Sequence, residues 1–362
     1  MVENMNNEYT PIIDSRKPKA ENGPPRGRQR QGIQIIGTQR SGSNLLRVIL
    51  DQSADIASPH PPHILVTFGP LMSKYEPLTK ENYQMLVNDV VDFVNANPVP
   101  WEGVELDKET IFNASERYSL FDLNRHIYEA AANAKNARYW CCKSMANVHY
   151  AKELETYEII DKYIFLYRDG RDVAASFKKA VVGDKHTYFL ARQWKEDQEA
   201  CLALAAQLET DRFFALNYET LISEPRRTVK ELCAFLDIGY NEEMLNFHTS
   251  NSSKITAAAG EMWANLEKPI MSDNTGKFLK SFKEGDLEIF EMVAGKTLGK
   301  LGYALYTSMD SEELISDESL DMYRKENQLL KNEVLTTARK SDLEKREPQL
   351  VILDTIRSRQ AV

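Results

Sequence analysis

A short apolar run that ends in a glycine turn and continues into a helical pattern constrains this chain more than any other feature. The segment IQIIGTQRSGSNLLRVIL runs from Ile33 to Leu50. Its first four residues have the composition of a buried strand, and the residues after the second glycine have a helical pattern. Such a turn directs several backbone N–H groups at one point, where the helix dipole also favours negative charge. The segment therefore predicts an anion site at the end of a buried strand.

The loop between the two glycines carries its positive charge early. Where a loop that hydrolyses nucleoside triphosphates has Lys followed by Ser or Thr, this chain has Ser43 and Asn44, and its cation is Arg40. Asn44 is a poor substitute for a hydroxyl that holds Mg²⁺. The later apolar runs YIFLY and FFALNY lead into Arg168 and Glu219 rather than into a metal-binding Asp. These differences argue against a metal-dependent triphosphatase.

The rest of the chain alternates strand-like and helical segments. We predict further strands at 163–167 and 213–218, with a long helical stretch between them at 187–209. Strands that alternate with helices favour an α/β fold whose mostly parallel sheet is covered on both faces. Residues 58–135 mix prolines with helical segments such as YQMLVNDVVDFVNANP, and we predict a helical insertion there.

Both ends of the chain differ from this pattern. Residues 1–31 are polar and predict a disordered tail, and residues 346–362 are also assigned to a tail. Residues 311–345 predict a charged helix with a stripe of heptad-like spacing and one polar core residue. Its packing on its own domain and a short coiled coil that forms a homodimer are both open interpretations. The stripe consists of Leu320, Tyr323, Asn327, Leu330 and Val334.

Composition excludes several classes of function. The net charge is 45 − 54 = −9, so a nucleic-acid groove is not expected. No run approaches 18 apolar residues, so we predict no membrane span, and the polar N-terminus lacks the apolar core of a signal peptide. Four cysteines without metal-ligand spacing indicate reduced thiols and a cytoplasmic protein. They are Cys141, Cys142, Cys201 and Cys233.

A second motif follows the second predicted strand. In YRDGRDVAASF, Arg168 ends the strand and Ser176 comes eight residues later. The two side chains could converge on one phosphate, or the segment could be a surface turn with an Asp/Arg pair. GTQRSGSNLL followed by YRDGRDVAAS resembles the two signature segments of sulfotransferases that use 3′-phosphoadenosine 5′-phosphosulfate (PAPS). The resemblance covers roughly residues 32–303.

This resemblance implies both a fold and a set of donor-binding residues. The fold would be a three-layer, P-loop-like α/β domain over 32–305, with a C-terminal helical extension. The first segment would hold the 5′-phosphosulfate, with Arg40 stabilising the leaving phosphate, and the second would hold the 3′-phosphate. Tyr218 would lie near the adenine, and Lys277 would add a late basic contact. PAPS would be the co-substrate and PAP the product, with no metal required. The implied donor-binding residues are Gly37, Arg40, Ser41, Gly42, Ser43, Asn44, Arg168, Ser176, Tyr218 and Lys277.

The catalytic base is less clear from the resemblance. In CCKSMANVHY, Lys143 fits the family's lysine that contacts the sulfuryl group, but Met145 stands where many relatives have histidine. His60 lies near the position of the glutamate in tyrosine-type members, and His63 follows three residues later. An imidazole of ordinary pKa, about 6.5, suits this role, although both histidines could simply line a Pro-rich loop. Weaker candidates are Glu102 and Glu105.

We therefore predict transfer of a sulfuryl group from PAPS to a hydroxyl acceptor. Aromatic residues in 58–135 offer apolar walls, which favours a small molecule, lipid or sterol acceptor. The deficit of positive charge argues against a polyanionic glycan. Two different kinds of protein also fit the motifs: a P-loop kinase or similar nucleotide-binding enzyme, and a non-catalytic interaction protein that binds PAP.

Overall fold

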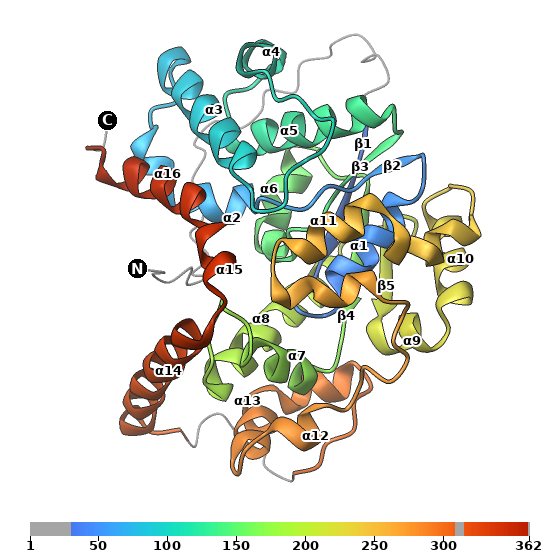
Figure 1. Ribbon diagram of the computed structural model, residues 1–362, viewed down its shortest axis with the longest axis vertical. Coiled ribbons are helices and arrows are strands. Elements are labelled where there is room, and N and C mark those ends of the chain that lie inside the picture. The colour runs from blue at the N-terminus through green and yellow to red at the C-terminus, as the bar shows by residue number, and fades with distance from the viewer. Residues whose placement is uncertain (1–29, 308–314, 361–362) are drawn as a thin grey trace.

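A five-stranded parallel sheet forms the centre of the computed structural model, which describes residues 30–307 and 315–360 (Figure 1). The strand order is β2-β3-β1-β4-β5, so the first strand lies in the middle. The three predicted strands are confirmed as β1, β4 and β5, whereas β2 and β3 were not predicted. The strands are β1 (Gln31–Ile36), β2 (Ile56–Ala57), β3 (Tyr139–Cys142), β4 (Lys162–Tyr167) and β5 (Phe213–Asn217).

Burial of both sheet faces explains why the strands read as continuous apolar runs. In β1, Ile33 and Ile35 belong to one hydrophobic core, whereas Ile36 belongs to the core on the other face. In β4, Ile164 and Phe165 divide in the same way. Successive side chains of a strand point to opposite faces, so both sets must be apolar when helices cover both faces.

Helices cover the sheet in two layers and form a third cluster at one end. On the face with Ile33 lie α1 (Ser43–Asp51), α9 (Tyr218–Ser223), α10 (Pro225–Phe235) and α11 (Asn251–Ala258), with η3 (Glu242–Thr249) and η4 (Glu261–Glu267). On the other face lie α3 (Lys80–Asn95), α5 (Leu120–Lys135), α6 (Ala151–Thr156), part of α8 (Thr187–Ala205) and η2 (Met145–Tyr150). The third cluster joins α8 to α7 (Gly170–Phe177) and α13 (Asp286–Lys300), with α12 (Phe278–Ser281) beside α7.

The insertion at 58–135 is helical, as expected. Besides α3 and α5 it contains α2 (Ile64–Phe68), η1 (Gly69–Lys74) and α4 (Lys108–Ala114). Side-chain caps mark three of its helix starts, because the oxygens of Thr79, Asp107 and Ser119 each accept a hydrogen bond from the backbone N–H three residues later. Such caps satisfy a donor that the helix itself leaves without a partner.

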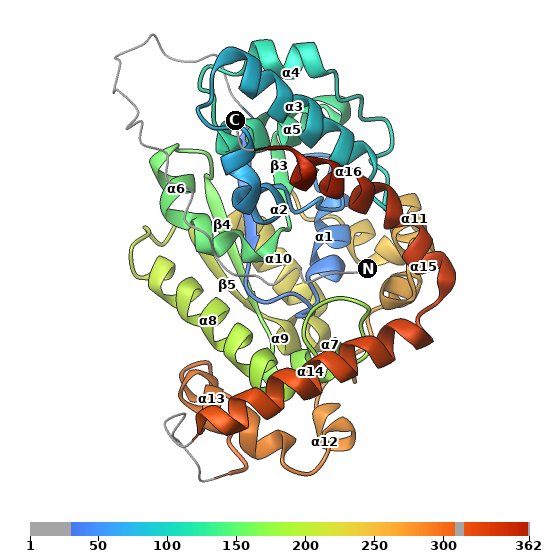
Figure 2. The ribbon, with the colours of Figure 1, turned by 90° about the vertical axis from the view of Figure 1, so that its left-hand side faces the viewer.

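The C-terminal helices run along one side of the domain, from the α13 end to α2 and α3 (Figure 2). They are α14 (Asp317–Thr337), α15 (Lys340–Glu344) and α16 (Glu347–Ser358). Leu320 and Tyr323 of α14 pack against the third cluster. The side-chain oxygen of Asn327 accepts hydrogen bonds from the backbone N–H groups of Lys185 and His186, at 2.7 and 3.0 Å. The predicted stripe therefore faces its own domain, which is the first of the two interpretations.

The predicted tail at 346–362 is wrong over most of its length. Helix α16 occupies it and buries Leu353 and Ile356, which are 2% and 0% exposed, in the core beside α3. Arg359 then forms an ion pair with Asp89, with Nη2 2.9 Å from Oδ1. The sequence conceals this helix because only two of its residues are buried among charged neighbours. At the other end, residues 1–29 of the predicted tail lie outside the described residues, and β1 already begins at Gln31.

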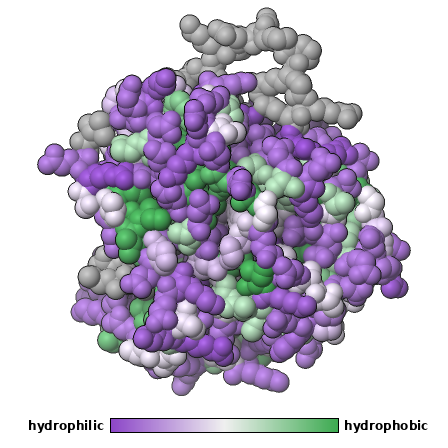
Figure 3. All heavy atoms as spheres, turned by 45° about the horizontal axis from the view of Figure 1, so that its top comes forward, coloured by the Kyte–Doolittle hydropathy of each residue, from purple (hydrophilic) through white to green (hydrophobic). Residues whose placement is uncertain are grey.

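The surface is mainly hydrophilic. On the face shown in Figure 3 most side chains are hydrophilic, and hydrophobic ones show as separate patches. Within residues 30–307 and 315–360, no helix combines the length and the apolar character that crossing a membrane requires.

Candidate active site

The parallel sheet gathers the predicted site residues at one edge. Each strand is followed by one of them at its carboxyl end: Arg40 follows β1, His60 follows β2, Lys143 follows β3, Arg168 follows β4 and Tyr218 follows β5. Because all five strands are parallel, these ends lie at the same edge of the sheet. Open α/β sheets bind ligands at this edge, where the strand order reverses beside the central strand.

Glycine is required at both ends of the loop between β1 and α1. Gly37 and Gly42 have φ values of 129° and 91°, which side chains rarely adopt. A Cβ atom on Gly42 would lie 2.3 Å from the ring of Tyr218, and one on Gly37 would lie 2.4 Å from the backbone oxygen of Leu166. Arg40 also has a positive φ, 72°, so the loop holds a non-glycine residue in the left-handed region.

Two polar side-chain atoms of this loop are buried without a hydrogen-bond partner in the described part of the chain. Ser41 Oγ and Asn44 Oδ1 have no hydrogen-bond partner among residues 30–307 and 315–360. Ser43, which is 5% exposed, begins α1, whose N-terminus points its backbone N–H groups into the loop. Helix α8 fixes the loop from the side, because Gln198 Nε2 donates to Thr38 Oγ1 at 2.9 Å. The loop thus provides the donors that an anion needs.

Arg40 joins the two predicted motifs. Its Nε donates to Ser176 Oγ at 3.1 Å, while Arg168 Nη1 donates to the backbone oxygen of Arg40 at 3.3 Å. Burial, followed by the positive charge of Arg168, lowers the pKa of Arg40 to about 10. Two guanidinium groups and a hydroxyl therefore meet in a partly buried place. A cluster of like charges of this kind is stabilised by a bound anion.

Arg168 is held from three sides. Its Nη2 donates to Asn274 O at 2.8 Å and to Asp172 Oδ2 at 3.4 Å, and its guanidinium carbon lies 4.5 Å from the ring centre of Tyr218. The Asp172 carboxylate also accepts the backbone N–H groups of Gly276 and Phe278, at 2.8 and 3.0 Å. Asp172 thereby attaches the 274–278 segment to α7. Neither Asp172 nor Asn274 was among the site residues predicted from the sequence.

Lys277 lies in this attached segment, directly before α12, and its side chain is exposed. The neighbouring Asn274 contacts Tyr218 from this segment, since its Nδ2 donates to the hydroxyl of Tyr218 at 2.6 Å. The expected contact of Lys277 with a nucleotide stays a prediction.

Lys143 is buried next to the loop. It is 6% exposed, and its pKa falls to about 7 because of burial, followed by the positive charges of Arg47 and Arg40. Met145, two residues later, is fully buried, and its Cε would lie 3.0 Å from a Cβ atom on Gly37. Met145 therefore packs against the loop.

The two candidate bases lie between β2 and α2. His60 is 7% exposed, and neither of its ring nitrogens has a hydrogen-bond partner in the described part of the chain. Its ring meets that of Trp263 edge to face at 4.8 Å. Burial, then the charge of Lys143, lowers the pKa of His60 well below 6.5, and the same two causes lower the pKa of His63 to about 3. The expected ordinary pKa is therefore wrong for the protein without ligand, and both imidazoles are neutral at pH 7.

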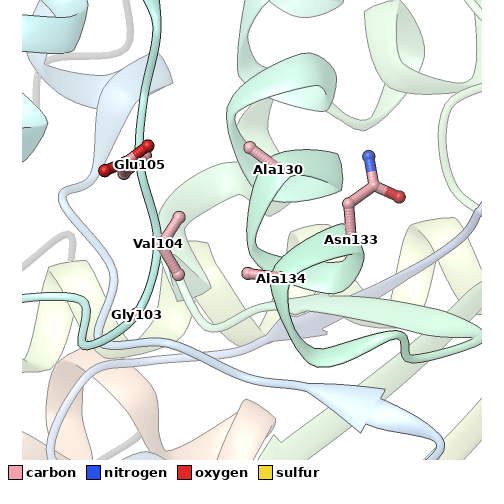
Figure 4. A pocket seen from close by; sticks show the side chains of 6 residues that line it. All are labelled: Gly103, Val104, Glu105, Ala130, Asn133 and Ala134. Carbon is pink, nitrogen blue, oxygen red and sulfur yellow. The ribbon is translucent and has the colours of Figure 1, made fainter.

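The two glutamates lie elsewhere. Glu102 accepts a hydrogen bond from Asn251 Nδ2 at 2.6 Å. Glu105 borders a hollow of about 580 Å³ between the 103–105 segment and α5, where Ala130 and Ala134 point toward that segment (Figure 4). Neither glutamate is among the charged groups that shift the pKa of Lys143 or of the two histidines. A second hollow of about 330 Å³ is lined by His60 and Arg47 as well as by Trp101 and Glu102.

Three further cations near the site were missed by the sequence reasoning. Arg47 of α1 is 1% exposed and donates to Ser58 O at 3.0 Å and to Thr256 Oγ1 at 2.7 Å. Burial, followed by the positive charges of Lys331 and Arg40, lowers the pKa of Lys185 to about 8. The positive charge of Arg346, which lies between α15 and α16, lowers the pKa of both histidines. The helical pattern of α1 could have indicated Arg47 as an inward residue, but nothing in the sequence marks Arg346.

The described residues hold no group of three or more His, Cys, Asp or Glu side chains arranged to bind a metal ion.

Comparisons with known proteins agree with this geometry. Residues 32–242 match the model of the sulfotransferase family. A Caenorhabditis briggsae protein named "Putative protein-tyrosine sulfotransferase" is 21% identical over 302 residues, which cover 81% of this chain and 96% of that protein. A protein-tyrosine sulfotransferase of Drosophila melanogaster is 22% identical over 219 residues, 59% of this chain and 39% of that protein.

Among solved structures, the sulfotransferase domain of the olefin synthase of Synechococcus PCC 7002 has the same fold. Its TM-score is 0.56 at 21% identity, over 80% of this chain and 98% of that domain. The predicted α/β fold with a P-loop-like arrangement is therefore confirmed. The family model covers more than half of the chain and includes both predicted motifs. The chain belongs to the sulfotransferase family, whose members are enzymes that use PAPS as the sulfuryl donor.

Proposed function

We propose that the edge formed by the five strand ends binds PAPS and transfers its sulfuryl group to a hydroxyl acceptor. The loop from Gly37 to Asn44 holds the phosphosulfate, Arg168 and Ser176 hold the 3′-phosphate, and Tyr218 lies beside the adenine. One observation carries this proposal most directly: Arg40 is hydrogen-bonded to Ser176 and, through its backbone oxygen, to Arg168. The two motifs therefore form one partly buried cationic site rather than two separate turns.

We assign a role in the transfer to each charged or titratable side chain of the site. The acceptor oxygen forms a bond to sulfur as the bond between sulfur and the bridging oxygen of the donor breaks, and PAP leaves with that electron pair. Arg40 stabilises the negative charge that develops on the leaving phosphate, and Lys143 contacts the sulfuryl oxygens. The proton of the acceptor hydroxyl passes to a neutral imidazole, His60 or His63. Donor binding raises the basicity of both imidazoles, because the bound anion offsets the cations that lower their pKa.

For the acceptor we propose a small molecule, which includes lipids and sterols. His60 is buried, and the C-terminal segment lies against the same side of the site, since Arg346 is 5.6 Å from the ring centre of Trp263. A covered base suits a small acceptor better than a tyrosine on a folded protein. A protein tyrosine is the second candidate, because the two relatives carry that activity in their names.

We further propose that no metal takes part and that the protein is cytoplasmic. Arg40 and Lys143 supply the positive charge that a metal would otherwise provide. All four cysteines are free and buried, which suits a reducing compartment.

Transfer of ³⁵S from labelled PAPS into a metabolite extract, with identification of the product by mass, tests the function. We expect one or more labelled small molecules, undiminished by EDTA, and a tyrosine-containing peptide library should remain unlabelled. Labelled peptides alone would favour the second candidate.

A thermal-shift comparison of PAP with ATP–Mg²⁺ distinguishes a sulfotransferase from a P-loop kinase. Stabilisation by PAP is expected, whereas stabilisation by ATP–Mg²⁺ alone would indicate a kinase. Stabilisation by PAP without any labelled product would indicate a protein that only binds PAP.

A further inference from the structure

Trp263 of η4 lies between the candidate base and a cation from the far end of the chain. The ring of His60 meets it at 4.8 Å, and the guanidinium carbon of Arg346 lies 5.6 Å from its ring centre. Arg346 Nη2 is also 4.0 Å from the sulfur of Met262, whose backbone oxygen lies 3.5 Å from Arg40 Nη2. Arg346 therefore belongs to the surroundings of the site, although it lies more than 100 residues beyond the last residue of the family match.

The chain is anchored on both sides of Arg346. The Asp342 carboxylate accepts the backbone N–H of Glu261 at 2.9 Å, and Lys345 Nζ donates to the backbone oxygen of Ala258. Helix α16 follows at once and is fixed by its buried Leu353 and Ile356. These contacts attach α15 to η4 and α11, so the position of Arg346 is built into the fold.

The charge of Arg346 lacks a close counter-charge. Burial lowers its pKa, and the carboxylate that opposes this effect, Asp342, is bound to a backbone N–H and forms no ion pair with Arg346 in the described part of the chain. A partly buried guanidinium without a paired anion costs free energy, which a ligand anion would recover.

The positions of the cations indicate whether such an anion belongs to the sulfuryl donor or to the acceptor. Arg40 is hydrogen-bonded to Ser176 and, through its backbone oxygen, to Arg168, so these residues lie on the donor side. Arg346 instead contacts the ring of Trp263, which His60 also meets, and its charge lowers the pKa of both histidines. It therefore lies on the side of the bases, where the acceptor hydroxyl must come.

We propose that Arg346 is a specificity-determining residue that binds an anionic group of the acceptor. The acceptor is then a hydroxyl compound that also carries a carboxylate or another oxyanion. The distance between its hydroxyl and this oxyanion matches the distance between the histidines and Arg346. The guanidinium fork matches a carboxylate or phosphate with two parallel hydrogen bonds. This inference rests on the proposed function, because it takes the histidine side as the acceptor side.

Binding of matched acids and amides to the full-length enzyme saturated with PAP tests this inference. The probes are 4-hydroxyphenylacetate and 12-hydroxydodecanoate, each against its neutral primary amide, with Kd values from calorimetry. We expect the wild type to bind at least one acid about 10- to 100-fold more tightly than its amide. Arg346→Gln should remove this preference without changing amide binding, and Arg346→Lys should restore part of it.

A matched control is Lys340→Gln in α15, which removes one positive charge from an exposed position of the same segment. It should leave the preference unchanged. Equal affinities of both acids and their amides in the wild type would overturn the inference, as would an unchanged preference in Arg346→Gln. Weaker PAP binding in Arg346→Gln would also overturn it, because Arg346 would then serve the donor. Failure of the wild type to bind PAP at all would instead refute the proposed function.

Discussion

The low pKa of Lys143 predicts that PAP binding takes up a proton. Burial and the charges of Arg47 and Arg40 lower the pKa of this lysine to about 7 in the protein without ligand. At pH 8 only about a tenth of the molecules then carry a charged Lys143. A bound phosphate reverses the local charge, which favours the ammonium form and raises the pKa again. The complex should therefore hold a proton that most free molecules lack.

The size and sign of the effect follow from this pKa. If Lys143 is fully charged in the complex, binding takes up about 0.9 proton at pH 8 but only about 0.1 proton at pH 6. Because the free enzyme holds fewer protons than the complex above pH 7, a rise in pH opposes binding there. The affinity for PAP should fall by up to about tenfold for each pH unit above 7, and it should level off below pH 7.

Calorimetric titration with PAP at pH 8, in HEPES and in Tris, measures this uptake. The two buffers differ in ionisation enthalpy, so the dependence of the observed enthalpy on the buffer gives the number of protons. Phosphate buffer is avoided because phosphate is itself an anion ligand. Lys143→Met should reduce the uptake to near zero, whereas Lys254→Met, at an exposed position of α11, should not change it. An equal uptake in wild type and Lys143→Met would refute the reasoning and move the proton to another group, such as a histidine.

Substitutions at five positions test the remaining site residues. Arg168→Ala should weaken PAP binding several-fold to a hundredfold, since it removes a charge-assisted contact. It should leave the affinity for adenosine 5′-phosphosulfate unchanged. Equal losses of affinity for both nucleotides in calorimetry would contradict the role of Arg168 at the 3′-phosphate. Arg40→Lys should keep part of the activity, whereas Arg40→Ala should lower kcat by about 10²-fold or more, and full activity of the alanine variant would contradict its role. His60→Ala should lower kcat by about 10²- to 10⁴-fold at nearly constant PAP affinity; if His63→Ala has this effect instead, the base is His63. Gly42→Ala should lower the free energy of unfolding by about 1 kcal/mol or more, because Gly42 has a positive φ and lies close to the Tyr218 ring. Unchanged thermal denaturation would argue against this close approach of Gly42 to Tyr218.

The loop after β1 and the motif after β4 could be predicted because their signals are local. The turn from Gly37 to Asn44 is one covalent segment, and Arg168 and Ser176 lie on one strand end and the helix that follows it. Spacing along the chain therefore fixes most of this geometry before any tertiary contact forms. The link between the two motifs, from Arg40 to Ser176, is the part that required the structure.

Other elements could not be predicted because they depend on distant contacts. Strand β2 has two residues, and it pairs with β3 only because the sheet brings Ile56 beside Tyr139. Helix α16 is stabilised by the core beside α3 rather than by a strong pattern of its own. The pKa of His60 is lowered by burial and by charges from residues as distant as Lys143 and Arg346, so the ordinary value expected from the sequence does not hold.

The two sides of the site therefore differ in how far they can be inferred from relatives. Arg40, Lys143, Arg168 and Ser176 all lie within residues 32–242, the part that matches the family, so the donor is shared with the family. Trp263, which His60 contacts, lies outside this part, and so does Arg346. If the acceptor is selected by these later residues, the family match, which ends at residue 242, does not identify it. The charge that the C-terminal segment brings to the histidines is then the better guide, and it favours an anionic acceptor over a neutral one.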